Sequence, residues 1–205
     1  SSFQLVDLTR SPHIAVILMI TSEHLDWHKN TLEYIQAKES IVKYQTFKDF
    51  AVINADFETS KKFADKTQGH VYFVSTKGET NGLYVRGQNI YSKISTHGQI
   101  AKTSDVLLPG RHNLQNIVAA VAVAKILGIS NAQIKKVLRS FRGLPHRLEL
   151  AGEVNGVKYY NDSFSTVPET TIAAVEAFTS PKILILGGSS KNSNFRELTG
   201  EIHDD

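Results

Sequence analysis

The stretch SEHLDWHKNTLEYIQAKESIVKYQ, residues 22–45, joins a cluster of polar side chains to a helix pattern. At about 100° of helical turn per residue, Lys38 falls near the middle of one apolar sector. That sector consists of Tyr34, Ile35, Ala37, Ile41, Val42 and Tyr44. Two histidines and an aspartate, spaced H-x-D-x-H, precede the helix. The pattern therefore predicts a helix that turns an ammonium group toward its own core.

Two interpretations of Lys38 remain open. Its stem can lie along the core while the amine reaches water, as most lysines on apolar faces do. Alternatively, burial favours the neutral amine, which is nucleophilic and reacts with carbon dioxide to give a carbamate. A carbamate is an oxygen ligand suited to Mg²⁺, and His24 or His28 could share that metal, with Asp26 as a partner of the ligating ring. H-x-D-x-H alone is a weak signal, and a surface turn before a helix explains it about as well.

Apolar runs at Ala15–Ile20 and 50–56 predict strands on either side of this helix. Three later segments, VYFVSTK, GLYVRGQNIYSKIS and QIAKTSDVLL, are rich in β-branched and aromatic residues and predict strands and hairpins. An Ala-rich helix then ends at Gly128, and NAQIKKVLRSF predicts an amphipathic helix begun by an Asn or Ser cap. This alternation predicts an α/β fold.

A domain boundary is predicted at RGLPHR, where Gly143 and Pro145 interrupt regular structure. After it, VKYYND predicts a strand, STVPETTIAAVEAF a helix with Thr166 and Glu169 as a capping box, and KILILGG a buried strand. Strand, helix and strand in this order indicate a parallel βαβ unit. The expected domains are therefore residues 1–145 and 146–205.

Five polar residues are candidates for binding. Asn113 and Asn116, three apart, share a helix face; capping explains Asn113 well, but Asn116 already lies inside the helix. Two amides at a helix start could orient a nucleotide. Arg147 is either a plain surface charge or a phosphate clamp. Asp162 follows a strand, where ligands of open α/β sheets bind, and Lys191 lies in a loop that is not a P-loop.

Composition narrows the classes of protein. The 41% hydrophobic and 21% charged content is ordinary for a globular domain, and a net charge of +3 without a basic block gives no reason to expect a nucleic acid partner. The lack of cysteine excludes disulfides and thiolate metal sites and fits a reducing cytoplasm. No apolar run is long enough to span a bilayer, so no membrane insertion is expected. The ends of the sequence suggest an internal piece of a longer protein.

Seven segments together resemble the Mur ligases of peptidoglycan synthesis. They are SSFQL, EHLDWH, YIQAKESI, GRHNLQNIVAAVAVA, GLPHRLE, NDSFSTVPETT and LGGSSKNSNF. SSFQL and GLPHRLE are typical of the family members that add D-glutamate. The resemblance implies the later part of the central ATP-binding domain, without its P-loop, followed by the first βαβ unit of a Rossmann-like C-terminal domain.

The resemblance also implies roles for individual residues. His24 would be a Mg²⁺ ligand, and Lys38, carbamylated, would act at the second metal site. The remaining residues form three groups: ATP contacts at Asn113, Asn116, Arg147 and Asp162; contacts with the incoming amino acid at Thr166 and Lys191; and contacts with the muramyl substrate at Ser1 and Gln4.

The reaction implied by the resemblance is ATP-driven amide bond formation between UDP-N-acetylmuramoyl-L-alanine and D-glutamate, through an acyl phosphate. Two sites depart from the family pattern. Phe164 and Val167 replace a lysine and an asparagine, and Ser190, Asn192 and Asn194 replace acidic or glycine positions, which leaves the incoming amino acid open. The alternatives are a related ATP-dependent amino-acid ligase of the same superfamily and a non-catalytic, ligase-like binding module. Because G-x-x-x-x-G-K-[ST] does not occur in the sequence, we expect this chain to be inactive on its own.

Overall fold

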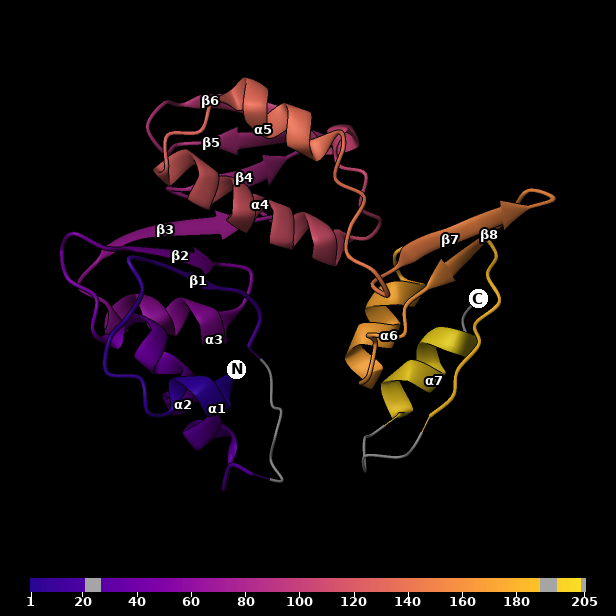
Figure 1. Ribbon diagram of the computed structural model, residues 1–205, viewed down its shortest axis with the longest axis horizontal. Helices are drawn as coiled ribbons and strands as arrows, with labels where there is room; N and C mark the ends of the chain where they lie inside the picture. Colours follow the sequence, from indigo (N-terminus) through magenta and orange to yellow (C-terminus); the bar gives the residue numbers. More distant parts are fainter. Residues whose placement is uncertain (21–26, 189–194, 204–205) are drawn as a thin grey trace. The chain divides into compact units, whose positions relative to one another are not determined.

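The computed structural model describes residues 1–20, 27–188 and 195–203 (Figure 1). The chain divides into two compact units, one made of Ser1–Asp105 and Gln115–Val137, the other of Val106–Leu114 and Leu138–Asp205. These units do not follow the predicted boundary after residue 145, and the domain assignment stays a prediction. Within the described ranges, no helix has the length and apolar character needed to cross a membrane.

In its described residues, the first unit holds a six-stranded sheet in the order β1-β2-β3-β4-β5-β6. β1 to β4 pair in parallel, whereas β4, β5 and β6 form antiparallel hairpins, so the predicted α/β class is confirmed. The strands are β1 (Ile14–Ile17), β2 (Phe50–Asn54), β3 (His70–Ser75), β4 (Leu83–Arg86), β5 (Asn89–Ser92) and β6 (Gly98–Lys102). The helices are α1 (Ser2–Leu5), α2 (Thr31–Lys43), α3 (Glu58–Lys61), η1 (Lys62–Lys66), η2 (Thr103–Asp105), α4 (Arg111–Ile126), which begins in the second unit, and α5 (Asn131–Leu138).

The core of the parallel half lies around β2. Ala51, Val52 and Ile53 are fully buried, because other elements cover both faces of this strand. A strand buried on both faces reads as a continuous apolar run rather than an alternating one, which is why FAVIN could be recognised in the sequence. Val42 of α2 and Phe63 of η1 belong to the same core cluster. The burial of β2 thus fixes the position of α2.

Two hydrogen bonds between side chains and backbone cap the start of helix α2. The Oδ1 atom of Asn30 accepts a hydrogen bond from the backbone N–H of Glu33 at 3.0 Å, and the Glu33 carboxylate accepts one from the Lys29 N–H at 2.8 Å. The apolar face is narrower than the predicted sector, since Tyr44 follows the helix and is 43% exposed. Lys38 is partly buried, with its Nζ 4.6 Å from the centre of the Tyr34 ring.

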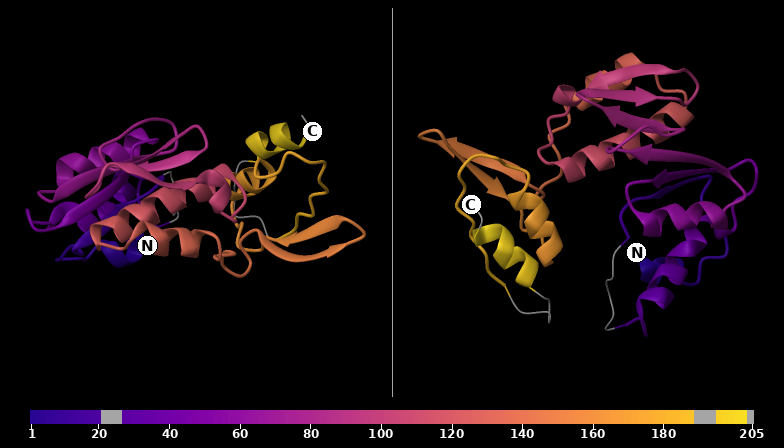
Figure 2. Two further views of the ribbon diagram at one scale, coloured as in Figure 1. Left: turned by 90° about the horizontal axis from the view of Figure 1, so that it is seen from above. Right: turned by 180° about the vertical axis from the view of Figure 1, so that it is seen from behind.

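Helices α4 and α5 cover one face of β4 to β6: they lie in front of the strands in Figure 1 and behind them in the reverse view of Figure 2. Gly128 follows α4 with φ 77°, as the predicted helix stop requires. The predicted cap of α5 is also confirmed, because the Oγ of Ser130 accepts from the Gln133 N–H at 3.3 Å and donates to Gln133 Oε1 at 2.7 Å.

A short seam joins the parallel and antiparallel halves of the sheet. β3 and β4 pair only at Val74 with Leu83 and at Ser75 with Tyr84. Beyond that point, the side chain of Asn81 accepts a hydrogen bond from the Phe73 N–H at 2.8 Å and donates one to the carbonyl of Val71 at 2.9 Å. One amide side chain therefore takes the place of a strand along this part of β3.

The second unit departs from the predicted βαβ unit. It contains an antiparallel hairpin of β7 (Glu149–Val154) and β8 (Val157–Asn161), with helices α6 (Pro168–Val175) and α7 (Arg196–His203). The predicted strand at 182–188 is wrong: this segment forms no strand, and Ile183 and Ile185 are 95% and 91% exposed. The predicted capping box of α6 is also wrong, since Val167 is its N-cap and makes no side-chain cap bond.

Asp56 ties together the carboxyl ends of β2 and β3. Its carboxylate accepts hydrogen bonds from Ser75 Oγ at 2.5 Å, from Thr76 N at 2.9 Å and from Thr76 Oγ1 at 2.8 Å. Burial opposes ionisation, but these bonds outweigh it, so the pKa of Asp56 lies below its ordinary value of 3.8.

We expect Asp56→Asn to lower the free energy of unfolding by about 1–2 kcal/mol at neutral pH. A carboxylate whose pKa is lowered by folding stabilises the native state above its unfolded pKa and loses that contribution as the pH falls through the lower, folded value. The difference between wild type and variant should therefore be constant above about pH 5 and shrink once the pH falls below 3.8. Urea unfolding of both proteins across this pH range measures the difference in unfolding free energy, with the exposed Asp65→Asn as control. A difference that persists in acid would contradict a stabilising role of the ionised Asp56 carboxylate.

Candidate functional site

Arg147 lies in a backbone turn whose conformation is rare for residues other than glycine. The residues on either side, His146 and Leu148, have φ of 64° and 44°. The left-handed region is costly for residues with a Cβ, and it persists only where the surroundings enforce it, often at functional sites. The sequence placed Arg147 at a predicted boundary without indicating this conformation.

Two carboxylates hold the Arg147 turn in shape. Asp162 Oδ1 accepts a hydrogen bond from the Leu148 N–H at 2.9 Å, and Glu149 Oε2 accepts one from the His146 N–H at 2.8 Å. The other oxygen of Asp162 accepts a hydrogen bond from the hydroxyl of Ser165. Asp162 thus follows β8, as predicted, but the strand belongs to an antiparallel hairpin, so the argument from the edge of an open parallel sheet does not apply.

The ring of Phe164 supports the guanidinium of Arg147. The Cζ atom of Arg147 lies 5.2 Å from the centre of the Phe164 ring. The His146 ring stacks on the same Phe164 ring, with 6.4 Å between the two ring centres. The Phe164 N–H also donates to the His146 carbonyl at 3.1 Å. A cation over an aromatic face is attracted by the ring quadrupole. In the sequence, Phe164 stands out only as a departure from the family, and no pattern there signals its contact with Arg147.

The orientation of the His146 ring follows from Asn161. The Oδ1 atom of Asn161 accepts a hydrogen bond from the Ser163 N–H at 3.1 Å, so its Nδ2 faces the Nδ1 of His146 at 2.9 Å. In this arrangement Nδ1 is the acceptor and Nε2 carries the proton of the neutral ring. The loop therefore offers one cation, Arg147, beside one imidazole donor.

The first turn of α4 lies in the same unit. Gly110 has φ 88°, and a Cβ there would stand 2.7 Å from the His112 ring, so only glycine fits. Burial lowers the pKa of His112, and the charge of Asp162 opposes that shift, which places the histidine within the electrostatic reach of the carboxylate. Asn113 is not the helix cap: its Nδ2 donates to the Pro109 carbonyl at 2.7 Å.

Other predicted residues are dispersed. Asn116 is exposed one turn further along α4, in the part assigned to the first unit. Ser1 and Gln4 are exposed at α1, and α1 packs against α2, the helix of Lys38. Thr166 is exposed, two residues before α6 begins. The predicted residues His24, Asp26 and Lys191 lie outside the described residues.

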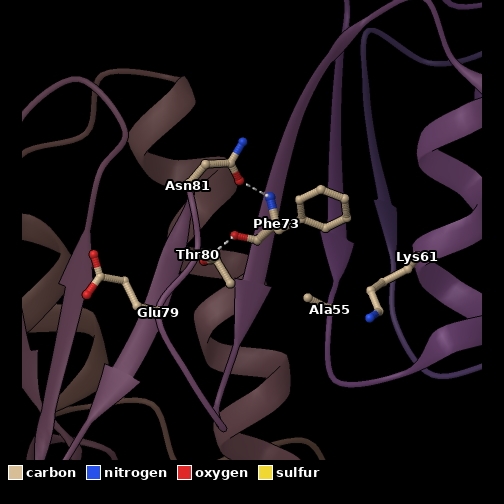
Figure 3. Close-up of a pocket in the computed structure, with 6 residues that line it drawn as sticks. All are labelled: Ala55, Lys61, Phe73, Glu79, Thr80 and Asn81. Atoms are coloured by element: carbon tan, nitrogen blue, oxygen red, sulfur yellow. Dashed lines mark hydrogen bonds between the residues drawn. The ribbon is translucent and has the colours of Figure 1, made fainter.

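A metal site is not formed by the described residues alone. Among residues 1–20, 27–188 and 195–203, no group of three His, Cys, Asp or Glu side chains could hold an ion. A shallow pocket at the ends of β2 and β3 contains none of the predicted site residues (Figure 3). It is lined by Ala55, Lys61, Phe73, Glu79, Thr80 and Asn81.

Comparison with known sequences gives consistent matches. Residues 2–124 match the Mur ligase middle domain. The chain is 40% identical over 200 residues to the UDP-N-acetylmuramoylalanine--D-glutamate ligase of Acetivibrio thermocellus, covering 97% of this chain and 43% of the relative. The corresponding ligase of Clostridioides difficile is 42% identical over 200 residues, 97% of this chain and 44% of its own length. The chain thus spans less than half the length of these curated relatives.

Solved structures show the same fold. MurF from Acinetobacter baumannii superposes with a TM-score of 0.67 at 21% identity, over 82% of this chain and 37% of that protein. MurF from Thermotoga maritima, in complex with ADP, superposes with a TM-score of 0.59 at 20% identity, over 82% and 39%. At this identity the likeness concerns the fold alone.

Proposed function

Because the chain belongs to the Mur ligase family, we propose that it is part of an enzyme that adds D-glutamate to UDP-N-acetylmuramoyl-L-alanine. The observation that carries this proposal is its 40% and 42% identity, over almost its whole length, to two ligases of that name. The cysteine-free composition fits a reaction in the cytoplasm.

In the proposed reaction, a carboxylate oxygen of the muramyl substrate attacks the γ-phosphorus of ATP and ADP leaves, which forms an acyl phosphate. The amino nitrogen of D-glutamate then attacks the acyl carbon, loses a proton and expels phosphate. Both steps develop negative charge on oxygen, which fixed cations and hydrogen-bond donors stabilise. ATP as the driving nucleotide is supported by the ADP complex of the related MurF.

We assign the nucleotide contacts to Arg147, Asp162, Asn113 and Asn116. The main support is the Arg147 turn, whose left-handed neighbours are held by Asp162 and Glu149. A guanidinium fixed in this way can form two parallel hydrogen bonds with a phosphate. Asp162 also accepts hydrogen bonds from the Leu148 N–H and the Ser165 hydroxyl, so we propose that, besides its nucleotide contact, it holds the turn around Arg147 in shape.

The remaining assignments rest on the family resemblance. Mg²⁺ would be held by His24 and by a carbamate on Lys38, and such an ion would neutralise phosphate charge. The partly buried Lys38 amine, close to the Tyr34 ring, fits a position shielded from bulk water. Ser1 and Gln4 would contact the muramyl substrate, and Thr166 and Lys191 the incoming amino acid.

A second candidate is a related ligase that adds another amino acid. Phe164 favours it, because the ring that replaces the family lysine is engaged with Arg147 and offers no charge to an incoming carboxylate. A non-catalytic, ligase-like binding module is the third outcome.

A substrate screen of the full-length protein separates these candidates. We expect phosphate release with UDP-N-acetylmuramoyl-L-alanine and D-glutamate, at a rate at least about tenfold above that with L-glutamate, glycine or meso-diaminopimelate. Glycine lacks the side-chain carboxylate, and L-glutamate and meso-diaminopimelate place theirs differently, so each would leave the groups that pair with it unpaired. The 205-residue chain should release none, since it lacks the loop that cradles the β- and γ-phosphates. A preference for another amino acid would favour the second candidate, and no turnover with any would favour the third.

A further inference from the structure

A buried histidine stands between α1 and α2. His28 is 2% exposed, and its Nε2 shares a hydrogen bond of 3.0 Å with the hydroxyl of Ser2, which is 1% exposed. Aromatic rings surround it. The ring of Trp27 lies 4.5 Å from the His28 ring, that of Tyr34 at 5.4 Å and that of Phe3 at 6.1 Å, measured between centres.

Packing alone does not account for a histidine at this position. The Nδ1 atom of His28 is buried and has no hydrogen-bond partner among the described residues. A buried polar atom without a partner costs about 1–3 kcal/mol, and an apolar side chain of similar size would avoid that cost. What an apolar side chain could not provide is the directional bond to Ser2. Hydrogen bonds fix position and register in a way that apolar contacts do not.

Helix α1 is too short to hold its position by itself. It has four residues, Ser2–Leu5, far fewer than an isolated helix needs to be stable in water. Its position is therefore set by contacts with the rest of the unit. One contact is the hydrogen bond of Ser2, which is buried and polar. Another is the packing of Phe3 on Trp27, at 4.8 Å between ring centres, which is half-exposed.

The same histidine is connected to Lys38 through the Tyr34 ring. The Tyr34 ring lies between the two, 5.4 Å from the His28 ring and 4.6 Å from the Lys38 Nζ. One buried ring thus contacts the segment of Ser1 and Gln4 on one side and, through Tyr34, the helix of Lys38 on the other.

We propose that His28 is a positioning residue: through its hydrogen bond to Ser2 it fixes α1 against α2, and so fixes the segment that carries Ser1 and Gln4 for the muramyl substrate. The consequence for substrate binding rests on the proposed function. The fixing of α1 does not, because it concerns only contacts within the first unit.

Amide hydrogen exchange on the 205-residue chain tests the fixing of α1. The reporters are the Leu5 and Val6 N–H groups, which donate to Ser1 and Ser2 carbonyls at 3.1 and 3.0 Å. We expect His28→Leu and Ser2→Ala to accelerate their exchange by roughly tenfold, relative to the fully buried Val52 and Ile53 amides of β2. Fluorescence of Trp27, the single tryptophan, should change in the same variants because Phe3 packs on it.

Two further variants distinguish positioning from bulk packing. The amide of Gln reaches about as far as the Nε2 of His, so His28→Gln should keep exchange at α1 near wild type. The exposed His97→Gln is the matched control. Unchanged exchange at α1 in His28→Leu would overturn the proposal, because the histidine would then not hold α1. Equal acceleration at α1 and β2 would also overturn it, because the histidine would then affect only the stability of the whole unit.

Kinetics of the full-length ligase test the consequence. His28→Leu and Ser2→Ala should raise the KM for UDP-N-acetylmuramoyl-L-alanine by roughly tenfold, change kcat much less, and leave the KM for ATP unaltered; His28→Gln should restore the wild-type KM. A loosened α1 with an unchanged KM would overturn the positioning of substrate residues. If the full-length protein does not use this acceptor at all, the proposed function fails, while the exchange result still decides whether His28 fixes α1.

Discussion

Replacing Lys38 with alanine in the full-length ligase should lower kcat for ligation by about 10²–10³-fold, the usual cost of losing one group that stabilises charge in the transition state. Added acetate should restore part of the activity, because a free carboxylate can occupy the space left by a carbamate. Phosphate release, measured with and without short-chain carboxylates, gives both numbers.

Lys43→Ala is the matched control for this experiment. Lys43 belongs to the same helix and also lies over a ring, with its Nζ 5.6 Å from the centre of Tyr44, but it is exposed. Its variant should keep nearly full activity. Loss of activity in Lys38→Ala without rescue by any carboxylate would indicate an ammonium role, and full activity would mean that the lysine merely lies along the core.

Arg147→Lys should raise the KM for ATP in the full-length ligase by roughly 10- to 100-fold, as expected for the loss of a hydrogen bond to a charged group worth about 1.5–3 kcal/mol. An ammonium keeps the charge but cannot form two parallel bonds with a phosphate or stack on Phe164 in the same way. Initial rates at varied ATP concentration measure this change.

Two variants accompany Arg147→Lys. Phe164→Leu keeps the guanidinium and removes only its platform, so a rise of about two- to fivefold is expected, corresponding to an exposed cation–π contact. Arg142→Lys, at an exposed position in the same connection, should leave the KM unchanged. If Arg147→Lys behaves like Arg142→Lys, then Arg147 is a surface charge, the alternative that its sequence left open.

The first unit was largely predictable because its strands and helices carry strong local signals. The continuous apolar run of β2 follows from burial on both faces, and the ends of α4 and α5 follow from the left-handed Gly128 and the Ser130 cap. Bounds were less accurate, since β1 covers Ile14–Ile17 and not Ala15–Ile20.

The second unit shows where local signals fail. β7 was missed, although Asn155 and Gly156, at φ 51° and 79°, form the left-handed pair typical of a tight hairpin turn. Conversely, residues 182–188 have the composition of a strand but pair with no neighbour in the described structure. Composition describes what a segment could bury, whereas a strand also needs partners for its backbone.

The candidate site could be named but not assembled from sequence. Arg147 and Asp162 stood out as chemical types, yet their relation runs through the backbone of Leu148, which no side-chain pattern reports. Left-handed φ at His146 and Leu148 is unexpected for residues with a Cβ. The contact of Phe164 with Arg147 likewise depends on this turn.

The seam between β3 and β4 divides the sheet into two parts that differ in how far apart their paired strands lie in the sequence. β4 and β5 are joined by Gly87 and Gln88 alone, whereas Ile14 of β1 must find Phe50 of β2. Closing a long loop has a larger entropy cost and slows the search for the partner. The hairpins of β4 to β6 should therefore form early and present one edge of β4. The parallel strands, with the helix of Lys38, then assemble outward from the two residue pairs and the Asn81 amide that bridge this edge.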